Sequence, residues 1–86
     1  MSNETQAMLI EVDKICKQVY PRNGFVKIEH VIDQVWILVR EGFDEYNATA
    51  HGKLNQIFPN VVFGFARGDI KEDKNLFSSS DVFWSN

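Results

Sequence analysis

The sequence predicts a small α+β domain in which three amphipathic helices precede a C-terminal β-hairpin, with a winged-helix-like outline. Two observations predict this fold. Apolar residues recur every three or four positions through the first two thirds of the chain, which is helical periodicity. After Pro59 they alternate instead, which is typical of a strand. A length of 86 residues allows one core, so residues 1–86 are expected to form a single compact domain.

The first helix is expected over residues 3–20. Its apolar residues would form one stripe, which comprises Met8, Val12, Ile15, Cys16 and Val19. Pro21 ends the helix because the residue before a proline avoids the helical region. The following Pro21-Arg22-Asn23-Gly24 is typical of a tight turn.

The second helix is expected over residues 28–41, with Trp36 at the margin of its apolar stripe. That stripe comprises Ile28, Val31, Ile32, Val35, Leu38 and Val39. Gly42 suits a left-handed C-terminal cap.

The third helix is expected over residues 44–58, from an N-cap at Asp44 to the break at Pro59. Its apolar residues are Tyr46, Ala50, Leu54, Ile57 and Phe58. The turn between the second and third helices is short, as in a helix-turn-helix motif.

The C-terminal hairpin is expected to pair a strand over residues 61–66 with a second strand that contains Val82 and Trp84. Phe63-Gly64-Phe65-Ala66 resembles the middle of the RNA-recognition strand motif. However, two valines replace the basic residue and glycine that should precede it, and three helical patterns come first. We therefore expect Phe63 and Phe65 to pack in the core. Arg67-Gly68-Asp69 is interpreted as a turn.

Composition narrows the class of protein. An apolar fraction of 44% is ample for a globular core, and a net charge of -3 argues against a general polyanion binder. A single cysteine excludes an internal disulfide. The polar N-terminus does not resemble a signal peptide, and no apolar run approaches the ~20 residues of a membrane span. These features predict a cytoplasmic protein without a membrane partner.

No catalytic, metal or cofactor constellation is visible in the sequence. Cys16 lies on the apolar stripe of the first helix, which favours an inert buried thiol. His30 and His51 lack further ligands at metal spacing. We therefore expect no enzymatic activity, no metal and no cofactor.

The favoured function is a small acidic interaction module that binds another protein and modulates it by steric occlusion, as an inhibitor, adaptor or immunity-type partner. Exposed Ile10, Ile37 and Trp84 would anchor the contact. Residues 1–46 hold eight acids against five bases, so acidic side chains would steer the module toward a basic surface. These acids are Glu29, Asp33, Glu41, Asp44 and Glu45. Ile10 and Ile37 also favour a homodimer.

The alternative function is a winged-helix DNA-binding transcriptional regulator. Helix 44–58 would be the recognition helix, and the loop over residues 67–74 would be the wing. The helix would present side chains that can bond base edges, namely Asn47, Thr49, His51, Lys53, Asn55 and Gln56. The wing would bring Arg67, Lys71 and Lys74 to phosphates.

Overall fold

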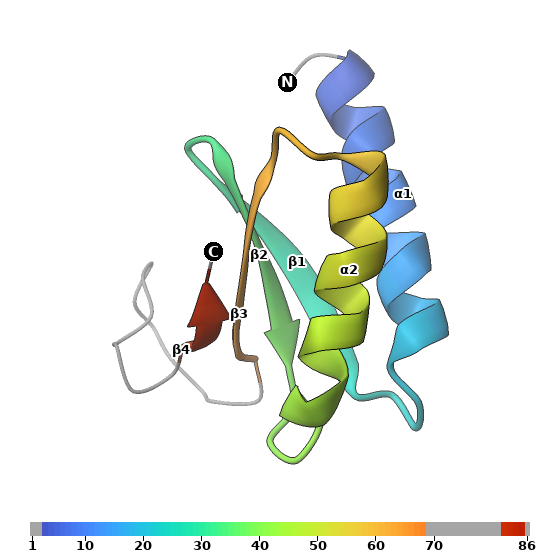
Figure 1. Cartoon of the computed structure of the whole chain (residues 1–86), viewed down its shortest axis with the longest axis vertical. Coiled ribbons are helices and arrows are strands. Elements are labelled where there is room, and N and C mark those ends of the chain that lie inside the picture. The colour runs from blue at the N-terminus through green and yellow to red at the C-terminus, as the bar shows by residue number, and fades with distance from the viewer. Residues whose placement is uncertain (1–2, 69–81, 86) are drawn as a thin grey trace.

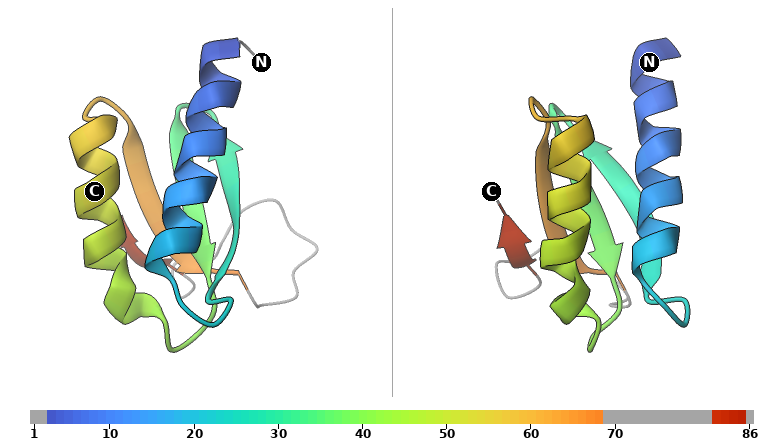
Figure 2. Two further views of the ribbon diagram at one scale, coloured as in Figure 1. Left: turned by 90° about the vertical axis from the view of Figure 1, so that its right-hand side faces the viewer. Right: turned by 45° about the vertical axis from the view of Figure 1, so that its right-hand side comes forward.

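The computed structural model describes residues 3–68 and 82–85, and the described part forms two layers (Figure 1). One layer is a mixed four-stranded sheet with the strand order β1-β2-β3-β4. The other layer consists of two α-helices, which lie on the same face of the sheet (Figure 2). In chain order the elements are α1 (Asn3–Val19), β1 (Phe25–Val31), β2 (Gln34–Val39), the 3-10 turn η1 (Asp44–Tyr46), α2 (Asn47–Ile57), β3 (Val62–Arg67) and β4 (Val82–Ser85).

The predicted second helix is wrong, because residues 28–41 lie mostly in a β-hairpin. Strands β1 and β2 pair antiparallel, and the chain reverses between Val31 and Gln34, which face each other across the ladder. Since a strand precedes α2, the described chain contains no helix-turn-helix at this point. The winged-helix-like outline and the arrangement of three helices before a hairpin are therefore wrong as well.

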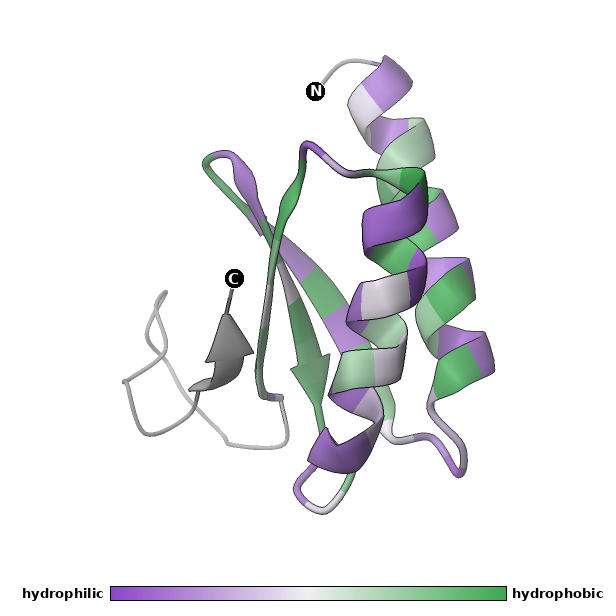
Figure 3. Cartoon of the chain, viewed as in Figure 1, coloured by the Kyte–Doolittle hydropathy of each residue, from purple (hydrophilic) through white to green (hydrophobic). Residues whose placement is uncertain are grey.

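Burial explains why this segment is a strand. Val35, Ile37 and Val39 alternate along β2, and all three are fully buried in the core beneath the helices. A strand places every second side chain on one face, whereas a helix would have turned Ile37 away from Val35. Valine and isoleucine also lose rotamer freedom in helices and pack well on a pleated surface. Figure 3 shows the hydrophobic character of β2 beside the mixed colouring of the helices.

Strand β3 lies inside the sheet and not in a separate hairpin. It pairs parallel with β2 on one edge and antiparallel with β4 on the other. The parallel pairing requires a crossover connection, which η1 and α2 supply between β2 and β3. Phe63 and Phe65 are fully buried on the helix side, which confirms their predicted role in the core.

The two helices close the core from one side. The first lies where its periodicity predicted it, and it buries Val12, Ile15 and Cys16. The second begins at Asn47, three residues later than predicted, because residues 44–46 form a 3-10 turn. Ala50 and Leu54 of α2 are fully buried. Ile57, one of the apolar residues expected on this helix, is 52% exposed at its end.

Candidate protein-binding surface

The β1–β2 hairpin ends in a two-residue turn with an unusual residue at its first position. Ile32 and Asp33 are the two turn residues, and Ile32 has a φ angle of 58°. Asp33 is not among the residues with positive φ, so the turn follows the pattern of type II′, which normally places glycine at its first position. A β-branched residue in this region is a genuine backbone outlier.

The side chain of Ile32 lies almost entirely in solvent. Its exposed fraction is 89%, the largest among the exposed large hydrophobic residues of the described chain. Ile32 therefore combines an unfavourable backbone conformation with an unfavourable apolar exposure. Strained residues cost folding free energy and persist only where the surrounding fold holds them, and they are concentrated at functional sites.

Three further side chains continue from the hairpin tip along the outer face of the sheet. Gln34 faces Val62 across the β2–β3 ladder, and Val62 is 39% exposed. Two residues further along β2 and on the same face, the Trp36 indole Nε1 donates to the Gln34 Oε1 at 3.1 Å. We call the set Ile32, Gln34, Trp36 and Val62 the hairpin-end surface.

The hairpin-end surface lies on the face of the sheet opposite the helices. Both described helices cover the other face, as the two views of Figure 2 show. Trp36 is half-buried because its ring packs on the backbone of Gly64, its register partner in β3. The site thus consists of a two-residue turn, an indole packed on Gly64 and an exposed valine. In the sequence, the alternation of apolar residues over 35–39 could have indicated strand β2. The same segment also fits a helical stripe, so the alternation did not decide between the two.

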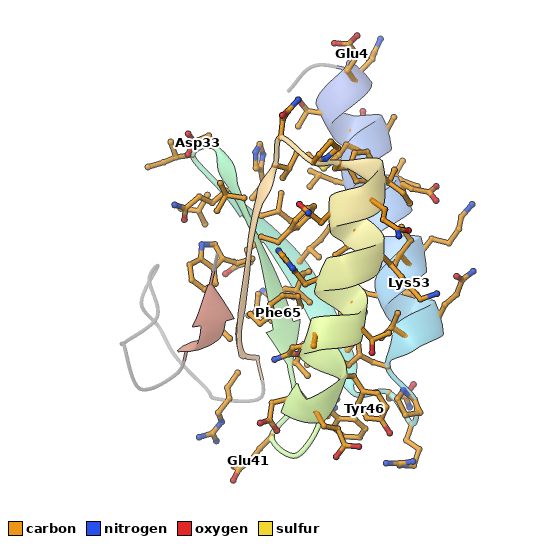
Figure 4. All side chains as sticks on the ribbon, viewed as in Figure 1. Glu4, Asp33, Glu41, Tyr46, Lys53 and Phe65 are labelled. Carbon is orange, nitrogen blue, oxygen red and sulfur yellow. The ribbon has the colours of Figure 1, made fainter. Side chains whose placement is uncertain are left out.

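The five predicted acidic side chains do not form one surface. Asp33 lies at the hairpin tip, and Glu41 lies at the opposite end of the molecule (Figure 4). There Glu41 pairs with the Arg67 guanidinium at 3.1 Å. Asp44 and Glu45 are exposed in η1, which follows β2 at that same end. Glu29 lies on β1, where its carboxylate is 3.9 Å from the Lys27 ammonium.

The three residues predicted as apolar anchors also lie in different parts of the structure. Ile37 is fully buried in the core, so its predicted exposure on a second helix is wrong. Ile10 is 62% exposed, but it belongs to the helix layer, away from the outer face of the sheet. Trp84 lies on β4, and its side chain is outside the described residues.

The residues predicted to read DNA are spread over different environments. Asn47 is buried, and its Oδ1 accepts a hydrogen bond from the Tyr20 hydroxyl at 2.5 Å, so its prediction as an exposed base-reading residue is wrong. His51 is half-buried, with its ring edge-on to Phe65. Four of the predicted residues are exposed on α2, namely Thr49, Lys53, Asn55 and Gln56. Arg67 bonds Glu41, and Lys71 and Lys74 lie outside the described residues.

None of the shifted titratable groups among the described residues lies on the hairpin-end surface: Cys16 and Tyr20 belong to the core, and His51 is half-buried on α2. Burial, with a smaller contribution from Asp13, raises the pKa of the Cys16 thiol to about 12. Burial also raises the pKa of Tyr20 and lowers that of His51. Within residues 3–68 and 82–85, no group of three His, Cys, Asp or Glu side chains is placed to hold a metal ion.

The fold and surface define a small α+β domain with two helices on one face of a mixed sheet. Comparison with protein-family models, curated proteins and solved structures gave no match. Among the described helices, none has the length and apolar character needed to cross a bilayer.

Proposed function

We propose that this chain is a non-enzymatic protein-binding module that docks its hairpin-end surface onto an apolar site of a partner protein. The observation that supports this proposal is Ile32, an isoleucine held at positive φ with 89% of its surface exposed. Glycine or asparagine would fit this turn with less strain. An isoleucine at this position is best accounted for by a contact that its side chain makes outside the chain.

The hairpin tip has the mechanical properties that favour binding. Both turn residues lie between paired strands, so the Ile32 side chain is presented by a backbone that is already ordered. A preorganised anchor loses little conformational entropy on association, which favours affinity. Trp36 adds a large, half-buried ring two strand positions beyond Gln34, and tryptophan is enriched among residues that dominate interface energies.

The partner is expected to offer an apolar pocket with a basic rim. Ile32 would enter the pocket, and the Asp33 carboxylate beside it would lie near the rim, where complementary charge raises the association rate. Bound in this way, the module would cover the working surface of its partner and block access to it. This mechanism suits an inhibitor or an adaptor.

The first experiment identifies the partner by position-specific crosslinking in the cells that produce the chain. A photoreactive amino acid replaces Ile32 in one variant and Thr49, exposed on α2, in the control variant. Adducts are identified by mass spectrometry. A protein crosslinked from position 32 and not from position 49 is the expected result. Equal adducts from both positions would contradict docking through the hairpin end.

The second experiment measures affinity with the purified partner. Ile32→Gly is expected to weaken binding at least tenfold, since it removes the anchor and leaves the turn intact. Ile10→Ala is the matched control, because it truncates an exposed isoleucine outside the hairpin-end surface. A change of less than about twofold is expected there, as for a surface change worth under 0.5 kcal/mol. The reverse pattern would place the interface on α1.

A further inference from the structure

Strand β1 leaves one edge of the sheet unpaired within the described ranges. It is the first strand in the order β1-β2-β3-β4, so only one of its two edges is bonded to a described strand. None of its seven residues is buried, although four are large and apolar, whereas four of the six residues of β2 are buried. A free edge presents a row of N–H and C=O groups that can pair with another strand.

We infer that a second copy of this chain pairs with β1 in antiparallel orientation, about a two-fold axis at Ile28 that is perpendicular to the sheet. Such an axis joins the two sheets into one and puts all helices on the same side. Residues that face each other across the new ladder must then point to the same face. The symmetry therefore permits registers with the axis at a residue, such as Lys27, Ile28 or Glu29.

Charge favours the axis at Ile28 over the axes at Lys27 and Glu29. Lys27 and Glu29 point to the same face, and their charged groups are 3.9 Å apart within one copy. An axis at Ile28 places Lys27 opposite Glu29 of the second copy, and this opposite-charge pair occurs twice. An axis at Lys27 would face lysine with lysine, and an axis at Glu29 would face carboxylate with carboxylate. Like charges directly opposite each other destabilise a strand pair.

The ladder is irregular beside this stretch, which limits the pairing. A register shift between Phe25 and Lys27 in the β1–β2 pair marks a β-bulge, which bends the strand and increases its twist. The regular edge therefore runs from Lys27 to Val31, and the Ile28 register uses its first three residues. Because both copies use the same edge, the contact is isologous and closes at two copies.

This inference does not depend on the proposed function, because β1 pairing uses the strand edge and leaves the hairpin-end surface to the partner protein. In the antiparallel dimer the two hairpin tips lie at opposite ends. A dimer would thus carry two partner-binding surfaces, and loss of dimerisation would leave each surface in place.

Oligomeric state is the first test. Sedimentation velocity over a range of protein and salt concentrations is expected to show a monomer–dimer equilibrium that weakens with salt, because the paired charges are exposed. Lys27→Glu and Glu29→Lys should each shift the chain to monomer, since each sets like charges opposite. The double variant should restore the dimer. A wild-type chain that is monomeric at its highest soluble concentration would overturn the inference.

Disulfide trapping tests the register directly. In a Cys16→Ala background, one chain carries Lys27→Cys and another carries Glu29→Cys. When the two variant chains are mixed under mild oxidation, we expect a disulfide between position 27 of one chain and position 29 of the other. The second Lys27–Glu29 pair of that dimer keeps both of its charged residues. Each variant alone should crosslink poorly, and Lys53→Cys, exposed on α2, is the control. Efficient trapping of the Lys27→Cys variant with itself would overturn the Ile28 register.

Discussion

The indole of Trp36 lies directly against Gly64, its register partner on the neighbouring strand. A Cβ atom built on Gly64 would lie 2.6 Å from the Trp36 Cζ3, closer than real Cβ contacts allow. The absence of a side chain at position 64 is therefore what lets the ring lie flat on the outer face of the sheet. This contact fixes the orientation of the largest side chain in the hairpin-end surface.

Gly64→Ala is expected to destabilise the domain by about 1–3 kcal/mol, because the added methyl group must displace a packed ring. Urea unfolding measures this change. Gly52→Ala is the matched control, since a Cβ there would meet nothing within 4 Å and the residue lies in α2. Alanine is a better helix former, so the control should gain roughly 0.5–1 kcal/mol. Equal effects of the two substitutions would contradict the Trp36–Gly64 contact.

Ile32→Gly is expected to raise the free energy of unfolding by about 1 kcal/mol, since glycine adopts positive φ without the steric cost that isoleucine bears. Thermal and urea unfolding both measure this change in the free energy of unfolding. The same substitution is expected to weaken partner binding at least tenfold, so stability and affinity should change in opposite directions. A loss of stability would mean that the Ile32 side chain supports the fold, which would remove the main support for the proposed interface.

Tyr20→Phe is expected to cost about 1–3 kcal/mol, because it leaves the buried Asn47 amide oxygen without its hydroxyl donor. A double-mutant cycle with Asn47→Ala checks this expectation. If the hydrogen bond carries the effect, the double variant should be less destabilised than the sum of the two single variants. Additive losses would indicate that the two residues act separately.

The raised pKa of the Cys16 thiol leads us to expect that the folded chain loses stability at alkaline pH. Its thiol has a pKa of about 12 in the folded chain, raised from 9.0 by burial first and by Asp13 second. Below pH 9 the thiol is protonated in the folded and in the unfolded chain, so its ionisation takes nothing from the free energy of unfolding. Between pH 9 and 12 only the unfolded state ionises, and stability falls by up to about 1.4 kcal/mol per pH unit.

Urea unfolding across this pH range compares the wild type with Cys16→Ala, which should lose less stability per pH unit because it lacks the thiol. The measured difference includes Tyr20 as well as the thiol, because burial first and Cys16 second raise the pKa of Tyr20. A thiol reagent should also label Cys16 only as fast as the chain unfolds at neutral pH. Identical slopes, or rapid labelling of the folded protein, would contradict a buried protonated thiol.

Parts of the fold could be predicted because local signals agreed with one another. The stripe of α1 has a single period and a proline at its end, and residues 61–66 alternate after a proline. In the segment that forms β1 and β2, the apolar residues fit both the spacing of a helix and the alternation of a strand. Its valines and isoleucines satisfied a helical stripe as well as the alternation over Val35, Ile37 and Val39. Local pattern alone could not decide between them.

The site was missed for the same reason. Ile32 belonged to the buried stripe of the expected helix, whereas in the hairpin it lies at the tip, and its turn lacks the glycine that would have indicated a reversal. Ile37 moved in the opposite direction, from expected surface to core. Asp33 alone of the predicted acidic residues lies beside Ile32 in the turn.

By itself the sequence determined the first helix, the core positions of Phe63 and Phe65, and the strand expected over residues 61–66, which forms as Val62–Arg67. In each of these segments the apolar residues follow a single period. Tertiary structure decided that residues 25–39 form two strands and not a helix. The β2 strand gains a neighbour on each edge, β1 and β3, and buries one face under both helices. Those contacts join residues far apart in the chain, and their combined burial outweighs the helical preference of a short segment.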